Sequence, residues 1–289
     1  MILPNYSTHN SMLRRFIRAV CRSVWLWWPV VLLVACRDQD LRPDEITTRI
    51  PSVEMMATYQ MMTENAPPPG FRDSVSFPLV DNNLPLLSDW RYESRMQFDG
   101  VFARTPRQVT ATASANVWYR QLGNYRRVVV TGMGDLLGQE GVTELEGVRL
   151  GDDTFLVRDH ICAASNTEAA ALVANLRAGD LIGGVANAVP DGARATINGE
   201  EVWRYTFTVN DLELPQLQLD MSSLVMMTSG ELWIAPEHNV VIRFYVNLDV
   251  ENVVIRLFDN TLPLTGTLLL RYDLYDIGID PNITQPYGC

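Results

Sequence analysis

The sequence predicts a mainly β protein of the α+β class, built on a strongly curved antiparallel sheet. Along about ten segments apolar residues alternate with polar ones, which is the period of strands that are buried on one face. Short turns rich in glycine and asparagine join the segments, and such turns favour antiparallel neighbours. Only short stretches have helical spacing. About ten strands exceed what an open meander holds, so we expect a strongly curved sheet or an incomplete barrel.

The beginning of the chain, residues 1–35, predicts an export signal. Four arginines and no acidic residue precede the apolar run Val24–Ala35, which has about twelve residues, whereas a spanning helix needs roughly 20. The end of the run, Leu33-Val34-Ala35-Cys36, resembles the lipobox of bacterial lipoproteins, whose cysteine receives acyl chains such as palmitate and becomes the first mature residue. We therefore expect Cys36 to anchor the protein on the extracytoplasmic face of the cell membrane. The alternative is an ordinary signal or a retained anchor helix.

Composition limits the partners of the mature chain. All 23 basic residues are arginines, and the leader takes four of them, so the 34 acidic residues leave a net charge of about −15. Such a surface repels nucleic acid and anionic headgroups. We expect no nucleic-acid partner.

The mature chain is expected to begin with a tether, residues 36–51, which has mixed charge and no apolar period. Residues 52–289 then form one domain. A short helix is expected over residues 53–65, because Ser52 can cap it and several methionines share one face. The prolines that follow end this helix, and residues 71–87 are expected to be extended and irregular.

The strands fall into two groups. The first group is expected at residues 96–102, 109–119, 125–131, 141–150 and 154–160. The second group is expected at residues 193–197, 202–209, 230–235, 240–250, 253–258 and 267–277. The dipeptide Asn198-Gly199 is the strongest hairpin signal, and no repeat of fixed period indicates a propeller or solenoid.

Two short helices are expected between the two groups of strands. Ser165 and Glu168 have the spacing of a capping box, and the first helix ends at Gly179. Asp180 then caps a second apolar stretch, residues 181–189, before Pro190.

The order of these elements resembles the LolA/LolB lipoprotein carriers and the related mycobacterial LppX/LprG lipoproteins. The resemblance covers residues 53–277 and depends most on NGEEVWRYTFTV at 198–209 and SGELWIAPEHNVVIRFYV at 229–246. It implies a half-barrel of roughly eleven strands, with helices across its open side and an apolar cavity for acyl chains. No ligand-binding residue of the family can be matched here, so the cargo stays open.

An apolar cavity is expected because the short helices offer little cover for a wide sheet. The expected lining is aromatic: Phe98, Phe102, Trp118, Trp203, Phe207, Trp233 and Phe244. The expected lid residues are Leu172, Leu176, Leu181 and Ile182. Any single aromatic residue among these is also explained as an ordinary core residue. Binding of an acyl chain needs only dry apolar surface, at about 25 cal/mol per Å² buried.

Cysteine positions predict one bridge. Cys21 leaves with the leader and Cys36 is the expected anchor, so Cys162 and Cys289 form the expected disulfide pair. The alternative is two buried or reduced thiols.

Catalytic patterns are weak, and we expect no enzyme, cofactor or metal. The mature chain has only His160 and His238, the run from Asp159 to Cys162 has no neighbouring ligand cluster, and no G-x-S-x-G elbow is present. The first hypothesis is a lipid or lipoprotein carrier. The alternative is a structural or interaction lipoprotein with a self-filled core that docks an envelope protein. An exported hydrolase is the third hypothesis, and it stays open because the two catalytic carboxylates of a glycosidase are paired in space and not in sequence.

Overall fold

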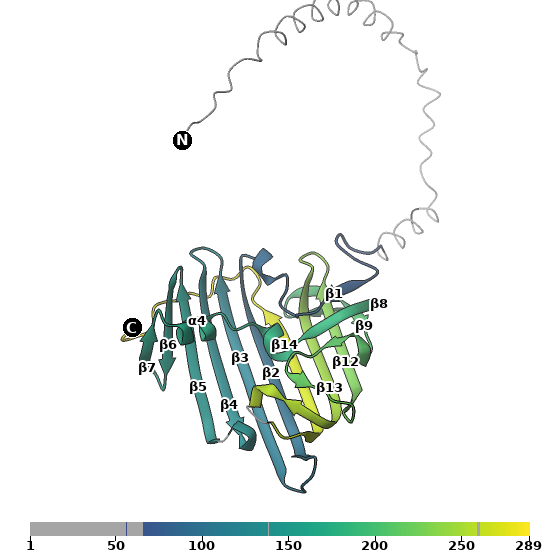
Figure 1. Cartoon of the computed structure of the whole chain (residues 1–289). Helices are drawn as coiled ribbons and strands as arrows, with labels where there is room; N and C mark the ends of the chain where they lie inside the picture. The colour runs from purple at the N-terminus through teal and green to yellow at the C-terminus, as the bar shows by residue number, and fades with distance from the viewer. Residues whose placement is uncertain (1–55, 57–65, 138, 259–260) are drawn as a thin grey trace, which may run out of the picture. The chain divides into compact units, whose positions relative to one another are not determined.

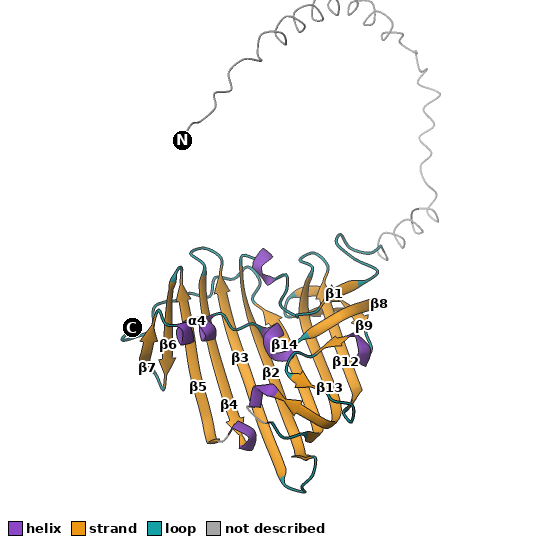
Figure 2. Ribbon diagram, in the orientation of Figure 1, coloured by secondary structure: helices purple, strands orange, loops and turns teal. Residues whose placement is uncertain are grey.

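The computed structural model describes residues 56, 66–137, 139–258 and 261–289. Residues 67–289 form one compact unit. The unit is a single antiparallel sheet, large, curved and unclosed, with few helices (Figures 1 and 2). The predicted fold class is confirmed at this level.

The first half of the chain supplies seven strands. Its strands are β1 (Val75–Phe77), β2 (Asp89–Phe102), β3 (Gln108–Arg120), β4 (Tyr125–Gly134), β5 (Gln139–Leu150), β6 (Asp153–Arg158) and β7 (Ile161–Ser165). Two 3-10 turns interrupt this half, η2 (Leu84–Leu86) and η3 (Asp135–Leu137). From β2 to β7 each strand pairs with the next one along the chain.

The second half begins with two helices, α4 (Glu168–Ala174) and α5 (Ala178–Ile182). Its longer strands are β8 (Gly184–Ile197), β9 (Glu200–Thr206), β12 (Leu224–Ala235), β13 (Val240–Ile255) and β14 (Leu264–Tyr275), and its short elements are η4 (Val209–Asp211), β10 (Leu212–Glu213), β11 (Leu217–Gln218) and η5 (Arg256–Phe258). The main order is β1-β8-β9-β12-β13-β14-β2-β3-β4-β5-β6-β7, so the last strand β14 pairs with β2 and joins the halves. The short strands β10 and β11 pair with β8 and β13.

The second predicted helix, residues 181–189, is wrong in most of its length. Helix α5 ends at Ile182, and β8 begins at Gly184. Gly184 lies so close to β1 that a Cβ atom there would be 2.1 Å from the carbonyl oxygen of Phe77. The apolar run therefore pairs with β1 and β10 as a strand.

Two other sequence predictions differ from the structure. Residues 240–250 and 253–258 were expected as two strands, whereas β13 continues to Ile255 across a register shift at Asn252, whose φ is 57°. The sheet has 14 strands instead of ten to eleven, because β1, β7, β10 and β11 have five residues or fewer, which is too short for a strand to be identified from its alternation.

The leader, the tether and nearly all of the helix expected at residues 53–65 lie outside the described residues. Within the described part of the chain, no helix has the length and apolarity that crossing a membrane requires.

Strand register divides the sheet into two faces. The inner face carries Phe98 and Phe244, which are fully buried, and helices α4 and α5 pack against strands of the sheet. The outer face carries mostly polar and charged residues, such as Arg95 and Arg271. The core lies on the inner face from β1 to β4 in the order of the sheet.

The C-terminal tail covers part of the outer face. Ile283 is buried against Val148 and Phe155 in a second, small apolar cluster. Cys289 at the end of the tail forms a disulfide with Cys162 on β7, and their Cα atoms are 5.3 Å apart. The predicted pairing of the two cysteines is confirmed.

Candidate functional site

Five of the seven expected cavity residues lie on the inner face, and they pack as core. Phe98 and Phe244 have no exposed surface, so other protein atoms cover them on every side. Phe207 contacts Phe244 with ring centroids 6.0 Å apart. Trp203 is also buried, and Phe102 packs against the same cluster. The centre of the inner face is therefore filled by the chain's own side chains.

Trp118 and Trp233 were expected on the inner face, and this is wrong. Trp118 follows Val117, which is fully buried, so the period of two places the tryptophan on the outer face, where Arg127 lies 5.2 Å from its ring. Trp233 pairs with Arg243 on the outer face and donates a hydrogen bond from Nε1 to Glu231.

The four residues expected in a lid differ in burial, and the lid role itself stays a prediction. Leu181 and Ile182 of α5 are buried, and Leu176 is partly buried. Leu172 is 67% exposed, because the buried face of α4 consists of Ala170 and Ala174.

Helix α4 lies close against β5 because both surfaces are small. A Cβ atom at Gly147 would be 2.6 Å from the backbone nitrogen of Ala174, so only glycine fits there. Thr167 caps the helix by accepting a hydrogen bond from the backbone of Ala170. The helix has seven residues and only two buried side chains, so little apolar burial holds it in place.

Polar contacts hold the C-terminal end of α4. The Tyr92 hydroxyl donates to the carbonyl oxygen of Leu176 at 3.3 Å, and Arg126 donates to the same oxygen. Arg149 donates to the side chain of Asn175. Burial raises the pKa of Tyr92, so its hydroxyl is protonated and able to donate.

Arg126 and Arg149 are register partners on β4 and β5, and they form the inner arginine pair. Like charges at directly opposite positions destabilise a sheet. Burial first, and then the charge of Arg126, lower the pKa of Arg149. The Nε atoms of both side chains are buried without a hydrogen-bond partner in the described part of the chain.

Helix α5 is fixed by a buried carboxylate. Asp81 accepts hydrogen bonds from Arg177 Nε at 3.2 Å, from Arg177 Nη2 at 3.1 Å and from the backbone nitrogen of Gly179 at 3.2 Å. Burial lowers the pKa of Arg177, but the bonds to Asp81 outweigh burial and raise it.

An apolar recess of about 180 Å³ opens on the inner face beside α4. It is lined by Val130, Gly132, Leu137, Thr143 and Leu145. Leu145 is two residues from Gly147 on β5, so the recess ends about 7 Å from the point where α4 packs. The recess and the surface that α4 contacts are therefore adjacent parts of the inner face.

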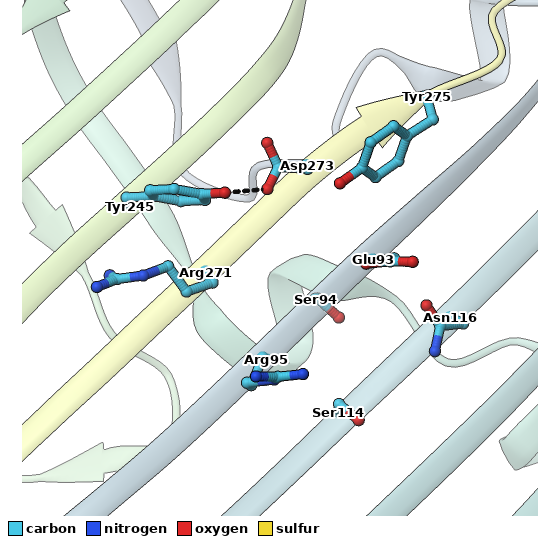
Figure 3. A pocket seen from close by; sticks show the side chains of 9 residues that line it. All are labelled: Glu93, Ser94, Arg95, Ser114, Asn116, Tyr245, Arg271, Asp273 and Tyr275. Carbon is cyan, nitrogen blue, oxygen red and sulfur yellow. Dashed lines mark hydrogen bonds between the residues drawn. The ribbon is translucent and has the colours of Figure 1, made fainter. Parts of the chain in front are cut away.

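The outer face carries a polar groove of about 360 Å³, shown in Figure 3. It lies over β13, β14, β2 and β3, and two of its carboxylates are already paired. Asp273 accepts from Arg243 Nε at 2.7 Å and from the Tyr245 hydroxyl, and Glu93 lies 3.0 Å from Arg91. Burial, with the bond to Asp273, raises the pKa of Tyr245 to about 12.

The histidines of the described domain lie in separate turns. Asp159 and His160 form the turn between β6 and β7, both with positive φ, and Cys162 is in the disulfide. His238 lies 3.5 Å from Glu200. Among the described residues, no group of three or more His, Cys, Asp or Glu side chains is placed to hold a metal ion.

No family model matches the chain, and no curated protein matches it. A solved structure of a DUF1329 family protein from Desulfovibrio piger is similar at 10% identity over 70% of this chain and 89% of that chain, with a TM-score of 0.15. A likeness with that TM-score carries no argument about function.

Sequence reasoning missed the arginines on both faces. Arg126 precedes Val128 and Val130 at the spacing of one strand face, so its position on the apolar side was readable from the alternation. Its partner Arg149 requires the register of β4 and β5, which the sequence does not state.

Proposed function

We propose that the protein is an exported lipoprotein, anchored to the membrane through Cys36, that binds one acyl chain of an anionic lipid on its inner face beneath α4. The observation that carries the proposal is the apolar recess beside a helix that is held by few contacts. The recess supplies dry surface, and the helix supplies cover that can be displaced.

The dimensions of this surface support an acyl chain. From Thr143 to Arg149 on β5 is six residues, or about 20 Å at 3.4 Å per residue. One leaflet of a bilayer is about 15 Å of hydrocarbon, so an extended acyl chain fits this length. The rows along the way are apolar or small, and the inner arginine pair lies at the end. An anionic headgroup at Arg126 and Arg149 would relieve the repulsion between them and satisfy their Nε donors.

Binding requires α4 to move, because a recess of 180 Å³ is smaller than the roughly 300 to 1,000 Å³ of small-molecule sites. Moving it breaks the two arginine bonds and the tyrosine bond at its C-terminal end, at a cost of about 4 to 7 kcal/mol. About ten buried methylenes return about 8 kcal/mol. The two terms are similar in size, which suits reversible uptake and release.

Lipid content tests this proposal. The protein purified from membranes should retain lipid other than its own anchor, detectable by extraction and mass spectrometry, and it should bind a fluorescent fatty acid. Leu145→Trp fills the recess and should weaken fatty-acid binding. Leu172→Trp is the matched control, because Leu172 points away from the sheet on α4. Equal binding by the two variants would refute the recess as the site.

A second candidate is the interaction lipoprotein with a self-filled core. The full burial of Phe98, Phe244 and Tyr272 favours it, since the widest part of the inner face holds side chains. It predicts a protein that binds no lipid beyond its anchor and that crosslinks in intact cells to one envelope protein. Loss of fatty-acid binding in Leu145→Trp would count against this candidate.

A further inference from the structure

Two arginines occupy opposite positions on neighbouring strands of the outer face. Arg95 of β2 and Arg271 of β14 are register partners. Arg126 and Arg149 are register partners in the same way on the inner face. Arg271 is held in place because its Nη1 donates to the carbonyl oxygens of Val246 and Leu270, at 3.1 and 2.9 Å, while its Nη2 donates to Asn247. Burial lowers the pKa of Arg271, and Tyr245, Glu231 and Asp273 act in the opposite direction.

The acidic residues of the groove do not pair with these two arginines. Asp273 is bonded to Arg243 and Tyr245, and Glu93 is paired with Arg91. Among the described residues, neither Arg95 nor Arg271 has a carboxylate within 4 Å. In a chain with a formal net charge of −11, the groove therefore holds two cations that lack an anion.

Register arranges the groove in two rows, each across three strands. The first row is Arg271, Arg95 and Ser114, and it presents hydrogen-bond donors. The second row is Asp273, Glu93 and Asn116, and it presents mainly acceptors. The rows lie two residues apart, which is about 7 Å along a strand. Figure 3 shows the side chains of both rows on the same side of the sheet.

We infer that this outer-face groove binds a phosphate ester of a small polyhydroxyl compound, that is, a sugar phosphate. Guanidinium groups bind phosphate oxygens through paired, charge-assisted hydrogen bonds, so the phosphate binds at Arg95, whose side chain points toward Ser114 in Figure 3. Arg271, which is hydrogen-bonded over β13, adds positive charge nearby. Carboxylate and amide oxygens at Glu93 and Asn116 accept from hydroxyl groups about 7 Å away. The groove volume of about 360 Å³ lies in the range of small-molecule sites. This site is separate from the acyl-chain site on the inner face.

Titration calorimetry on the full chain tests the inference with three probes: glucose 6-phosphate, inorganic phosphate and glucose. We expect a Kd of about 1 mM for glucose 6-phosphate, so a concentration of about 10 mM should saturate the site. Glucose should show no saturable binding at the same concentration. Arg95→Gln should weaken glucose 6-phosphate about tenfold or more, because one charged donor is lost. Arg107→Gln is the control, since Arg107 is an exposed arginine in the turn between β2 and β3.

Two comparisons separate the parts of the inference. Glu93→Gln should weaken glucose 6-phosphate and leave inorganic phosphate unchanged, because only the sugar reaches the acceptor row. Inorganic phosphate binding as tightly as glucose 6-phosphate would overturn the sugar assignment. A short-chain phosphatidylglycerol that binds in an Arg95-dependent way, while glucose 6-phosphate does not, would overturn it in favour of a lipid headgroup. No saturable binding of any phosphate, or equal effects of Arg95→Gln and Arg107→Gln, would overturn the site itself.

Discussion

Replacing Asp81 by asparagine should loosen helix α5. The change keeps the shape of the side chain and removes its charge. It weakens two hydrogen bonds from Arg177 and one from the backbone of Gly179. Because Gly179 packs with its Cα against Leu79 and Asp81, the neighbouring backbone cannot move away easily.

The expected loss follows from the burial of the two partners. Breaking a fully buried ion pair costs about 3 to 5 kcal/mol. Asp81 is 5% exposed but the Arg177 side chain is 39% exposed, so water solvates the guanidinium once it is released. Discounting for that exposure gives about 2 to 3 kcal/mol of unfolding free energy. In a domain of this size, 1 kcal/mol shifts Tm by about 2 to 4 °C, so Tm should fall by about 4 to 12 °C.

Urea unfolding followed by tryptophan fluorescence measures this loss, with the disulfide kept oxidised. Asp152→Asn is the control: Asp152 is exposed in the turn between β5 and β6, and its variant should stay within about 0.5 kcal/mol of the native protein. Arg177→Gln added to Asp81→Asn should cost much less than it does alone, because the partners act as a pair. An Asp81→Asn protein as stable as the Asp152→Asn protein would refute the assignment of Asp81 as the residue that fixes α5.

Four other outcomes are expected. Cys36→Ala should abolish acylation and release the protein from membranes after a carbonate wash, and retention would indicate an anchor helix. Cys289→Ser opens a loop with a sequence separation of 127 and should lower stability by up to roughly 4 to 5 kcal/mol relative to the oxidised native protein in thermal unfolding, and the reduced native protein should match the variant. Gly147→Ala should displace α4, cost about 1 to 3 kcal/mol and speed proteolysis between β7 and α5, whereas Gly199→Ala, with no atom within 4 Å of the added Cβ, should not speed cleavage there. Burial and the bond to Asp273 raise the pKa of Tyr245 to about 12, against about 10 when unfolded, so stability should fall as pH rises between these values, and Tyr245→Phe should remove that part of the loss in pH-dependent melts.

The alternation of residues was sufficient to predict most of the sheet. The strand expected at residues 109–119 lies within β3, since five of its apolar residues are buried and its polar residues fall between them. The helix expected after Ser165 does form, but its cap is Thr167 and not Ser165, and α4 ends at Ala174, before the Gly179 that was expected to end it. The second helix failed because Val185 and Ala188 are apolar in either structure, and only pairing with β1 and β10 selects the strand.

The candidate sites were less accessible to sequence reasoning, because each depends on register between distant segments. Arg95 and Arg271 are 176 positions apart in number and are opposite only because β14 pairs with β2. Arg126 and Arg149 require the exact offset of one hairpin. Cysteine counting found the disulfide without register, because only two candidates were left once Cys21 and Cys36 were assigned to the expected leader and anchor.

The error at Trp118 has a physical cause that also explains the tail. When a strand is buried on one face, the alternation of apolar and polar residues identifies that face. Strands β5 and β6 are covered on both faces, so alternation does not identify the inner one. On the inner face α4 packs at Gly147, and on the outer face Ile283 of the tail packs against Val148 and Phe155. Trp118 belongs to the apolar surface under the tail, so a large aromatic side chain is explained there without an acyl-chain cavity on the inner face. The disulfide at Cys289 then keeps the tail on that surface, which would otherwise expose an apolar patch to solvent.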